Sequence, residues 1–230
     1  MNLELTSYSD KIDKLFSEHS NSKNASAMTT YMKDKFPYYG IKSRERKFLQ
    51  SEFLKTNGLP DPDRLPELVQ ILWEKPHREI HYFTIDLIRK LVKKLDATFL
   101  DTLEFLITNK SWWDTVDHLA NPIGGPLLNK FSFENPTRTD KWSESKDMWL
   151  QRSSIIYQLG YRTETNTELL KKYIEKHMHS KEFFLRKAIG WALRQCSKSN
   201  QSWVKEFVKT HQLSGLSNRE ATKYFYTNKL

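Results

Sequence analysis

Apolar residues recur along much of the chain at the three- and four-residue spacing of an amphipathic helix. Four stretches show this spacing most clearly, within residues 65–73, 80–91, 99–107 and 169–174. We count about a dozen helical segments and no segment with the alternating pattern of a half-buried strand. The pattern therefore predicts an all-α protein.

Turn-forming residues mark where several of these helices are expected to begin or end. Asp61-Pro62 and Asn135-Pro136 each place a capping side chain before a proline of the first helical turn. Gly58 follows an apolar run, at a point where glycine commonly ends a helix. These signals support the helical interpretation.

The clearest interruptions of the helical pattern lie at residues 37–40 and 121–126. Neither is long enough to be a linker between domains. We therefore expect residues 1–230 to form a single domain.

A degenerate repeat of 35 residues indicates the architecture of this domain. KDMWLQRS at residues 146–153 matches KEFFLRKA at residues 181–188, and SWWDTVD at residues 111–117 lies one period earlier. In an all-helical chain such a period is typical of stacked helix pairs, in which one helix of each pair lines a concave surface. The predicted fold class is an all-α, HEAT-like helical-repeat solenoid with a concave groove.

The repeat predicts which side chains share that surface. Equivalent positions of successive repeats stack side by side, so Asp117, Arg152 and Lys187 should form one row. Aromatic side chains stand one helical turn before or after the row, at Trp113, Phe183 and Trp191. The alternative is that the aromatic residues belong to the core and the charges to a solvated face.

Two adjacent tryptophans weaken that alternative at one position. Neighbouring residues of a helix point about 100° apart, so Trp112 and Trp113 face different surroundings. We expect Trp112 to point inward and Trp113 to point into the groove.

The charge of the chain suggests a polyanionic partner. There are 37 Lys and Arg against 28 Asp and Glu, a formal net charge of +9. Basic surfaces bind phosphates, although they also serve solubility. A basic stretch that includes Lys42 and Lys47 is a candidate for phosphate contact, or is simply the start of a helix.

Several function classes lack their sequence signals. Cys196 is the one cysteine, so no intramolecular disulfide can form, and we expect it to be a packing residue in a reducing compartment. His77 and His81 share a helix face, but no third ligand is near, so we expect no metal. Dinucleotide, P-loop and serine-hydrolase motifs are absent from the sequence. No signal-peptide pattern or run of about 18 apolar residues occurs, so we expect a cytoplasmic protein without membrane contact.

Several motifs resemble the AlkD-type DNA alkylation repair glycosylases, and the similarity extends over nearly the whole chain. They are KSWWDTVD at residues 110–117, MWLQR at residues 148–152, KEFFLRKAIGW at residues 181–191 and AMTTYMKDKF at residues 27–36. The resemblance implies a HEAT-like solenoid that cradles double-stranded DNA in its groove. It also implies excision of positively charged N3- and N7-alkylated purines, such as 3-methyladenine and 7-methylguanine, without base flipping.

The resemblance also implies roles for individual residues. The catalytic carboxylate falls on Asp117 and the paired tryptophans on Trp113 and Trp191. The resemblance places DNA contacts at Tyr31 and Arg152. From charge, position and the repeat we also expect them at Lys42, Lys47, Lys110, Phe183 and Lys187. At Lys42 the chain departs from close relatives, which have a polar amide after the Gly-Ile pair. No metal or cofactor is implied, and a groove of this kind can work as a monomer.

The chemistry of such a lesion explains these residue types. An alkylated purine is already cationic, so it leaves as a neutral base and the sugar develops oxocarbenium character. A carboxylate at Asp117 can stabilise that cation and orient water, and Arg152 and Lys187 are expected to keep it ionised. Tryptophan faces at positions 113 and 191 attract cations. We expect a monofunctional hydrolysis that leaves an abasic site.

Two alternatives remain open from the sequence. One is a non-enzymatic HEAT-like module that binds distorted or branched nucleic acid, which would not need Asp117 together with both tryptophans. The other is a HEAT-type adaptor for proteins, whose binding would lack the steep salt dependence of phosphate contacts.

Overall fold

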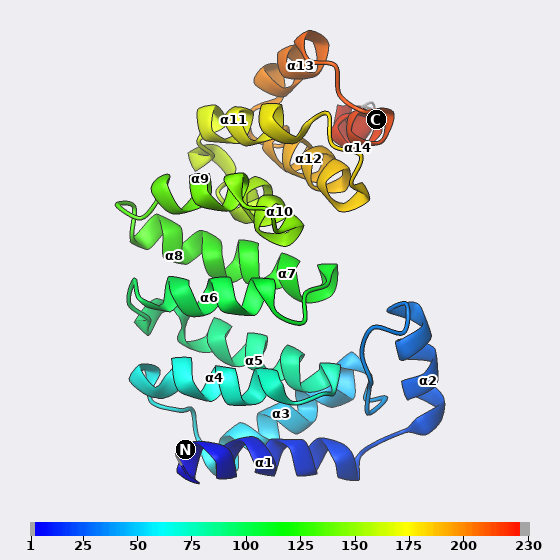
Figure 1. The fold of residues 1–230 in the computed structure, drawn as a ribbon, viewed down its shortest axis with the longest axis vertical. Coiled ribbons are helices and arrows are strands. Elements are labelled where there is room, and N and C mark those ends of the chain that lie inside the picture. Colours follow the sequence, from blue (N-terminus) through cyan, green and yellow to red (C-terminus); the bar gives the residue numbers. More distant parts are fainter. Residues whose placement is uncertain (1–2, 226–230) are drawn as a thin grey trace. The chain divides into compact units, whose positions relative to one another are not determined.

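The computed structural model describes residues 3–225, and within this range every regular element is helical (Figure 1). The α-helices are α1 (Leu3–Glu18), α2 (Ser22–Tyr31), α3 (Ser43–Asn57), α4 (Leu65–Glu74), α5 (Arg78–Leu91), α6 (Phe99–Thr108), α7 (Trp113–Leu119), α8 (Gly125–Lys130), α9 (Thr137–Glu144), α10 (Met148–Ile156), α11 (Thr167–His177), α12 (Phe183–Cys196), α13 (Gln201–Thr210) and α14 (Gly215–Thr222). The all-α prediction is confirmed, and the four most periodic stretches are α4, α5, α6 and α11.

Short helices of other types extend or join these elements. Within residues 3–225, five are 3-10 helices, η1 (Pro62–Arg64), η2 (Val92–Lys94), η4 (Tyr157–Gly160), η5 (Arg162–Glu164) and η6 (Lys223–Phe225). One is a π-helix, η3 (Ala120–Gly124).

The chain folds as two compact units, with the boundary between Asp96 and Ala97. Unit 1 contains α1 to α5 and unit 2 contains α6 to α14. Each unit has its own apolar core, with Trp73 among the fully buried side chains of unit 1 and Trp142 among those of unit 2. That residues 1–230 form one solenoid domain stays a prediction.

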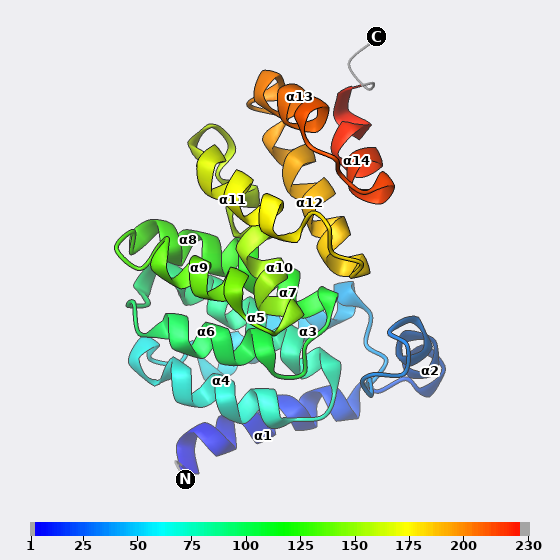
Figure 2. The ribbon, with the colours of Figure 1, turned by 45° about the horizontal axis from the view of Figure 1, so that its top comes forward.

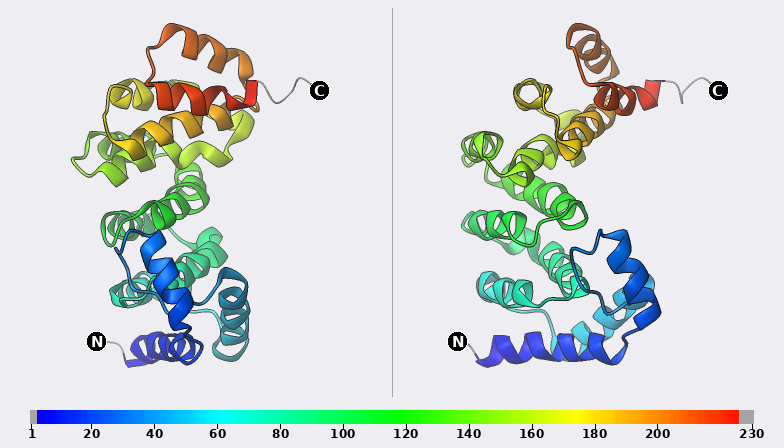
Figure 3. Two further views of the ribbon diagram at one scale, coloured as in Figure 1. Left: turned by 90° about the vertical axis from the view of Figure 1, so that its right-hand side faces the viewer. Right: turned by 45° about the vertical axis from the view of Figure 1, so that its right-hand side comes forward.

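In unit 1, α1 packs against α3, α4 and α5, and α2 stands to one side on a loop (Figure 3). The buried carboxylate of Glu79 anchors this loop, because it accepts hydrogen bonds of 2.8–3.1 Å from the backbone N–H groups of Tyr39, Gly40 and Ile41. Gly40 has a φ of +89°, and a Cβ there would clash with the carbonyl oxygen of Asn21. The interruption predicted here is confirmed.

In unit 2 the helices stack as successive pairs (Figure 2). The second helices of the pairs contact one another in series: α7 packs on α10, α10 on α12, and α12 on α14. The first helices cover them, since α9 and α11 pack on α10 and α13 packs on α12. This is the HEAT-like stacking that the 35-residue period predicts.

The interruption predicted at residues 121–126 is wrong. The chain continues from α7 through η3 into α8 without leaving helical geometry. Pro126 lies in the first turn of α8, and the wider π-helical turn before it accommodates a residue that has no N–H. Gly125 packs closely there, because a Cβ on it would lie 2.6 Å from the carbonyl oxygen of Tyr157.

The two predicted helix starts differ. Asp61 caps η1 as expected, since its Oδ1 accepts a hydrogen bond of 3.0 Å from the backbone N–H of Asp63. The prediction for Asn135 is wrong, because α9 begins only after Pro136 and receives no side-chain cap. The Asn135 side chain instead accepts a 3.0 Å hydrogen bond from the hydroxyl of Thr139.

None of the helices within residues 3–225 combines the length and apolar character needed to cross a membrane.

Candidate active site

Asp117 of α7 and Arg152 of α10 form a bidentate ion pair. Nε of Arg152 donates to Oδ1 of Asp117 at 2.7 Å, and Nη2 donates to Oδ2 at 2.8 Å. Nη1 of Arg152 donates to the carbonyl oxygen of Phe184 in α12. Only 5% of the Arg152 side chain is exposed, against 17% for Asp117. The guanidinium therefore fixes the carboxylate in one orientation while leaving it within reach of solvent.

An aromatic cluster holds the start of α7 against the neighbouring helices. The ring centroid of Trp112, the residue before α7, lies 5.7 Å from that of Trp149 in α10 and 5.1 Å from that of Phe184. Trp112 thus packs against its neighbours, although it is half-buried rather than a core residue. Trp113 is also half-buried and stands one helical turn before Asp117.

Lys187 faces α14 rather than Asp117. Its Nζ lies 3.1 Å from the carboxylate of Glu220, which also pairs with Arg194 at 2.9 Å and with Lys223 at 2.7 Å. The hydrogen bond from Lys223 and the charge of Lys187 lower the pKa of Glu220 to about 2, against the effect of burial. Asp117 therefore pairs with the guanidinium of Arg152, whereas Lys187 stabilises the contact between α12 and α14.

The glycine of the KAIGW motif explains that contact. A Cβ on Gly190 would lie 2.8 Å from the carbonyl oxygen of Ser217, so only glycine allows α14 to approach α12 this closely. The next residue, Trp191, is half-buried on α12. The tight crossing thus fixes the helix that carries the second predicted tryptophan.

The remaining predicted DNA contacts are distributed over both units. In unit 1 they are Tyr31 at the end of α2, with 70% of its surface exposed, and the exposed Lys42 and Lys47 at the start of α3. In unit 2 they are the half-buried Lys110 before α7 and Phe183 at the start of α12, which is 56% exposed. DNA contact by these residues stays a prediction.

Sequence reasoning missed three participants, namely the Phe184 carbonyl, Trp149 and Glu220. A backbone carbonyl leaves no sequence signal, and Trp149 was visible only as the aromatic position of the repeat. Glu220 follows Lys187 by about one repeat length. Extending the period into the last helix pair would have suggested a partner there.

His81 and Cys196 are packing residues. His81 is buried, and its Nε2 lies 3.1 Å and 3.0 Å from the carbonyl oxygens of Trp73 and Lys75. Cys196 is buried, and burial raises the pKa of its thiol to about 11. Residues 3–225 contain no group of three or more His, Cys, Asp or Glu side chains placed to hold a metal ion.

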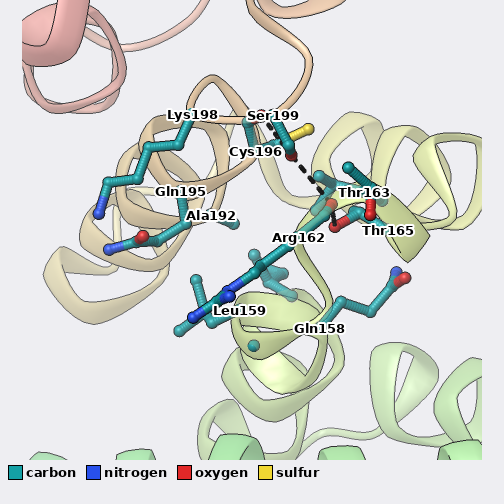
Figure 4. A pocket seen from close by; sticks show the side chains of 13 residues that line it. Gln158, Leu159, Arg162, Thr163, Thr165, Ala192, Gln195, Cys196, Lys198 and Ser199 are labelled. Atoms are coloured by element: carbon teal, nitrogen blue, oxygen red, sulfur yellow. Dashed lines mark hydrogen bonds between the residues drawn. The ribbon is translucent and has the colours of Figure 1, made fainter.

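A cavity of about 570 Å³ lies elsewhere in unit 2, at the carboxyl ends of α10 and α12 (Figure 4). Leu159, Ala192 and Cys196 contribute apolar walls, and Arg162 and Lys198 extend along one side. Neither Asp117 nor either predicted catalytic tryptophan lines it. The Asp117–Arg152 pair is thus a separate feature of the unit.

Unit 2 is thus an all-helical stack of HEAT-like helix pairs that holds a buried arginine against a partly exposed aspartate. The chain belongs to the DNA alkylation repair enzyme family, whose model matches residues 12–225. The description of the family indicates an enzyme that takes part in the repair of alkylated DNA.

Solved structures agree with this assignment. A protein of Enterococcus faecalis, described as a predicted DNA alkylation repair enzyme, is 33% identical with a TM-score of 0.84, over 90% of this chain and 97% of that one. AlkD2 from Streptococcus mutans shares the fold at 17% identity with a TM-score of 0.64, over 96% of this chain and 98% of that one. No curated protein sequence matches the chain.

Proposed function

We propose that this protein is a monofunctional DNA glycosylase. It hydrolyses the N-glycosidic bond of positively charged alkylated purines, 7-methylguanine and 3-methyladenine, in double-stranded DNA. The observation that carries the proposal is the Asp117 carboxylate, which a buried arginine holds by both oxygens and which solvent can still reach. Membership in the DNA alkylation repair enzyme family supports it.

The carboxylate of Asp117 supplies the charge that the reaction needs. A cationic purine departs as a neutral base, so the positive charge moves to the sugar as the bond breaks. A preoriented carboxylate stabilises that oxocarbenium character and orients the attacking water, without reorganising during the step. Because the leaving base is neutral, neither a metal nor an organic cofactor is needed.

Arg152 acts as a positioning residue for Asp117. The sequence suggested that it holds a DNA phosphate, but three of its N–H groups already donate within the protein and its side chain is 5% exposed. A guanidinium in this position cannot rotate toward a phosphate without releasing the carboxylate. We therefore assign phosphate contact to the more exposed lysines.

Trp113 and Trp191 select the cationic lesion. An indole face attracts a cation by about 0.5–2 kcal/mol, depending on how far the pair is desolvated. The same attraction strengthens as the sugar becomes cationic, so the tryptophans favour both the charged substrate and the transition state. Because binding of this kind needs no enclosing pocket, the lesion can react without being flipped out of the helix.

The proposal includes a setting for the reaction. The protein acts as a monomer on the DNA of the cytoplasm, where the reduced thiol of Cys196 is stable.

Release of free base from methylated duplex DNA tests the proposal. The wild-type protein should release 7-methylguanine and 3-methyladenine and leave abasic sites, and borohydride should trap no protein–DNA adduct. A trapped adduct would refute the monofunctional step. No release, together with tight and salt-sensitive duplex binding, would favour the non-enzymatic module instead.

A further inference from the structure

A second basic feature lies in unit 1, whereas the residues assigned to catalysis belong to unit 2. A cavity of about 440 Å³ opens between α3 and α5. One face of α3 lines it with Lys47 and Gln50, and α5 lines it with Arg89 and Lys90 above the buried ring of Phe83. The cavity thus combines an apolar floor with three cations.

The three cations of this cavity are not neutralised within the protein. Lys47, Arg89 and Lys90 are exposed, and in the described part of the chain none of them forms an ion pair or a side-chain hydrogen bond. The one acid in the cavity wall, Asp86, is paired with the guanidinium of Arg46 at 3.0 Å. The cavity therefore presents a net positive charge to solvent.

Gln50 adds a polar group that has no partner. The residue is 5% exposed and lines the same cavity, and its Nε2 makes no hydrogen bond to the described residues. A buried amide N–H without an acceptor destabilises a fold, so its presence calls for a ligand or another explanation. An acceptor oxygen in the cavity would satisfy it if the side chain turned to expose this nitrogen.

We propose that this cavity binds a phosphate group. A phosphate offers several acceptor oxygens, which match the ammonium groups of Lys47 and Lys90, the planar guanidinium of Arg89 and the amide of Gln50. The group comes either from the DNA backbone or from a free phosphate. Assigning the phosphate to DNA depends on the proposed function, whereas the inference that the cavity binds phosphate depends only on the residues that line it.

Two variants test the site, and the first has a matched control. Arg89→Ala/Lys90→Ala removes two exposed cations, and Lys11→Ala/Lys14→Ala removes the same charge from the exposed face of α1. We expect the first variant to bind undamaged duplex DNA several-fold more weakly than the control. The slope of log affinity against log salt should also fall by about 1 for a lost phosphate contact.

Gln50→Leu separates ligand binding from packing. Leucine is similar in size and removes the unpartnered amide, so the melting temperature should stay the same or rise. We nevertheless expect weaker phosphate binding, because an amide donor is lost. A merely structural glutamine would leave binding unchanged.

A titration with inorganic phosphate, monitored through the NMR chemical shifts of the backbone amides, identifies the source of the bound phosphate. Shifts confined to α3 and α5 that disappear in Gln50→Leu, with duplex affinity equal to the control, assign the site to a free phosphate. A selective loss of duplex affinity in Arg89→Ala/Lys90→Ala assigns it to the DNA backbone. If neither of these two results is obtained, the proposed phosphate site is wrong. Because both readouts use undamaged DNA or phosphate, they are independent of base release by the wild type.

Discussion

Arg152 and Asp117 pair α10 with α7 in unit 2, Arg46 and Asp86 pair α3 with α5 in unit 1, and these two pairs differ in geometry. In unit 2, Arg152 binds both oxygens of Asp117 and the side chains are 5% and 17% exposed. In unit 1, Arg46 donates one hydrogen bond of 3.0 Å to Asp86, and the side chains are 10% and 29% exposed. The unit 2 pair is therefore the more rigid and the better shielded.

The two pairs have similar surroundings, because an aromatic residue stands one helical turn before each aspartate. Trp113 precedes Asp117 by one helical turn, and Tyr82 precedes Asp86 by one turn, with the Arg46 guanidinium 5.1 Å from the Tyr82 ring centroid. In unit 1, therefore, an aromatic residue, an aspartate and an arginine stabilise the packing of α3 against α5. What distinguishes the unit 2 pair is a carboxylate held on both oxygens.

Replacing each arginine in turn gives the largest expected difference between the two pairs, measured as the loss in the free energy of unfolding. Arg152→Ala leaves a largely buried carboxylate without its partner, so the free energy of unfolding should fall by about 3 kcal/mol. Arg46→Ala breaks a more exposed pair with one hydrogen bond and should cost about 1 kcal/mol. Urea unfolding of both variants measures the difference, and equal losses would mean that the geometry has no energetic consequence.

Replacing the tryptophans should have a smaller effect, on rate alone. Trp113→Phe and Trp191→Phe each weaken a cation–π contact, so single-turnover release of 7-methylguanine should slow about 2- to 10-fold. Trp203→Phe is the matched control, because Trp203 is also half-buried in unit 2 but stacks on Phe207 in α13. An equal effect of all three variants would assign the loss to packing.

Acid should weaken the contact between α12 and α14. The pKa of Glu220 is lowered to about 2 from an ordinary value of 4.5, chiefly by the hydrogen bond from Lys223. A lowered carboxyl pKa contributes stability that is complete above the unfolded value and is lost as pH falls from about 4.5 toward 2. Unfolding measured against pH should therefore be steeper in this window for wild type than for Glu220→Gln. Parallel curves would contradict the ion-pair network.

Cysteine chemistry should show the smallest effect. Burial raises the pKa of the Cys196 thiol to about 11, so little thiolate exists at neutral pH. Iodoacetamide should label the native protein far more slowly than the urea-unfolded protein, and Cys196→Ala should cost about 1 kcal/mol or less. Rapid native labelling would contradict the packing role.

The sequence predicted the parts of the molecule that depend on periodicity. Helical spacing identified α4, α5, α6 and α11, and the 35-residue period brought Asp117 to Arg152. Equivalent positions of neighbouring helix pairs must stack, so a period is enough to place two side chains together.

Features set by local backbone geometry or by distant packing were not predictable in this way. Proline at position 126 suggested a break, but a π-helical turn carried the chain through it. The period also placed Lys187 in the row of Asp117, whereas the close approach of α14 at Gly190 brings Glu220 to that lysine. A periodic pattern contains no information about such a crossing.

The most direct test of the account is single-turnover base release from methylated duplex DNA by Asp117→Asn and by Asp86→Asn. Both changes remove one charge and retain a similar shape at an arginine-paired position. We predict that Asp117→Asn releases base about 10²- to 10³-fold more slowly while still binding duplex, and that Asp86→Asn at saturating protein stays within about tenfold of wild type, since Asp86 contributes packing rather than chemistry. Full activity in Asp117→Asn, or an equal loss in both variants, would contradict the assignment of the chemistry to the unit 2 pair.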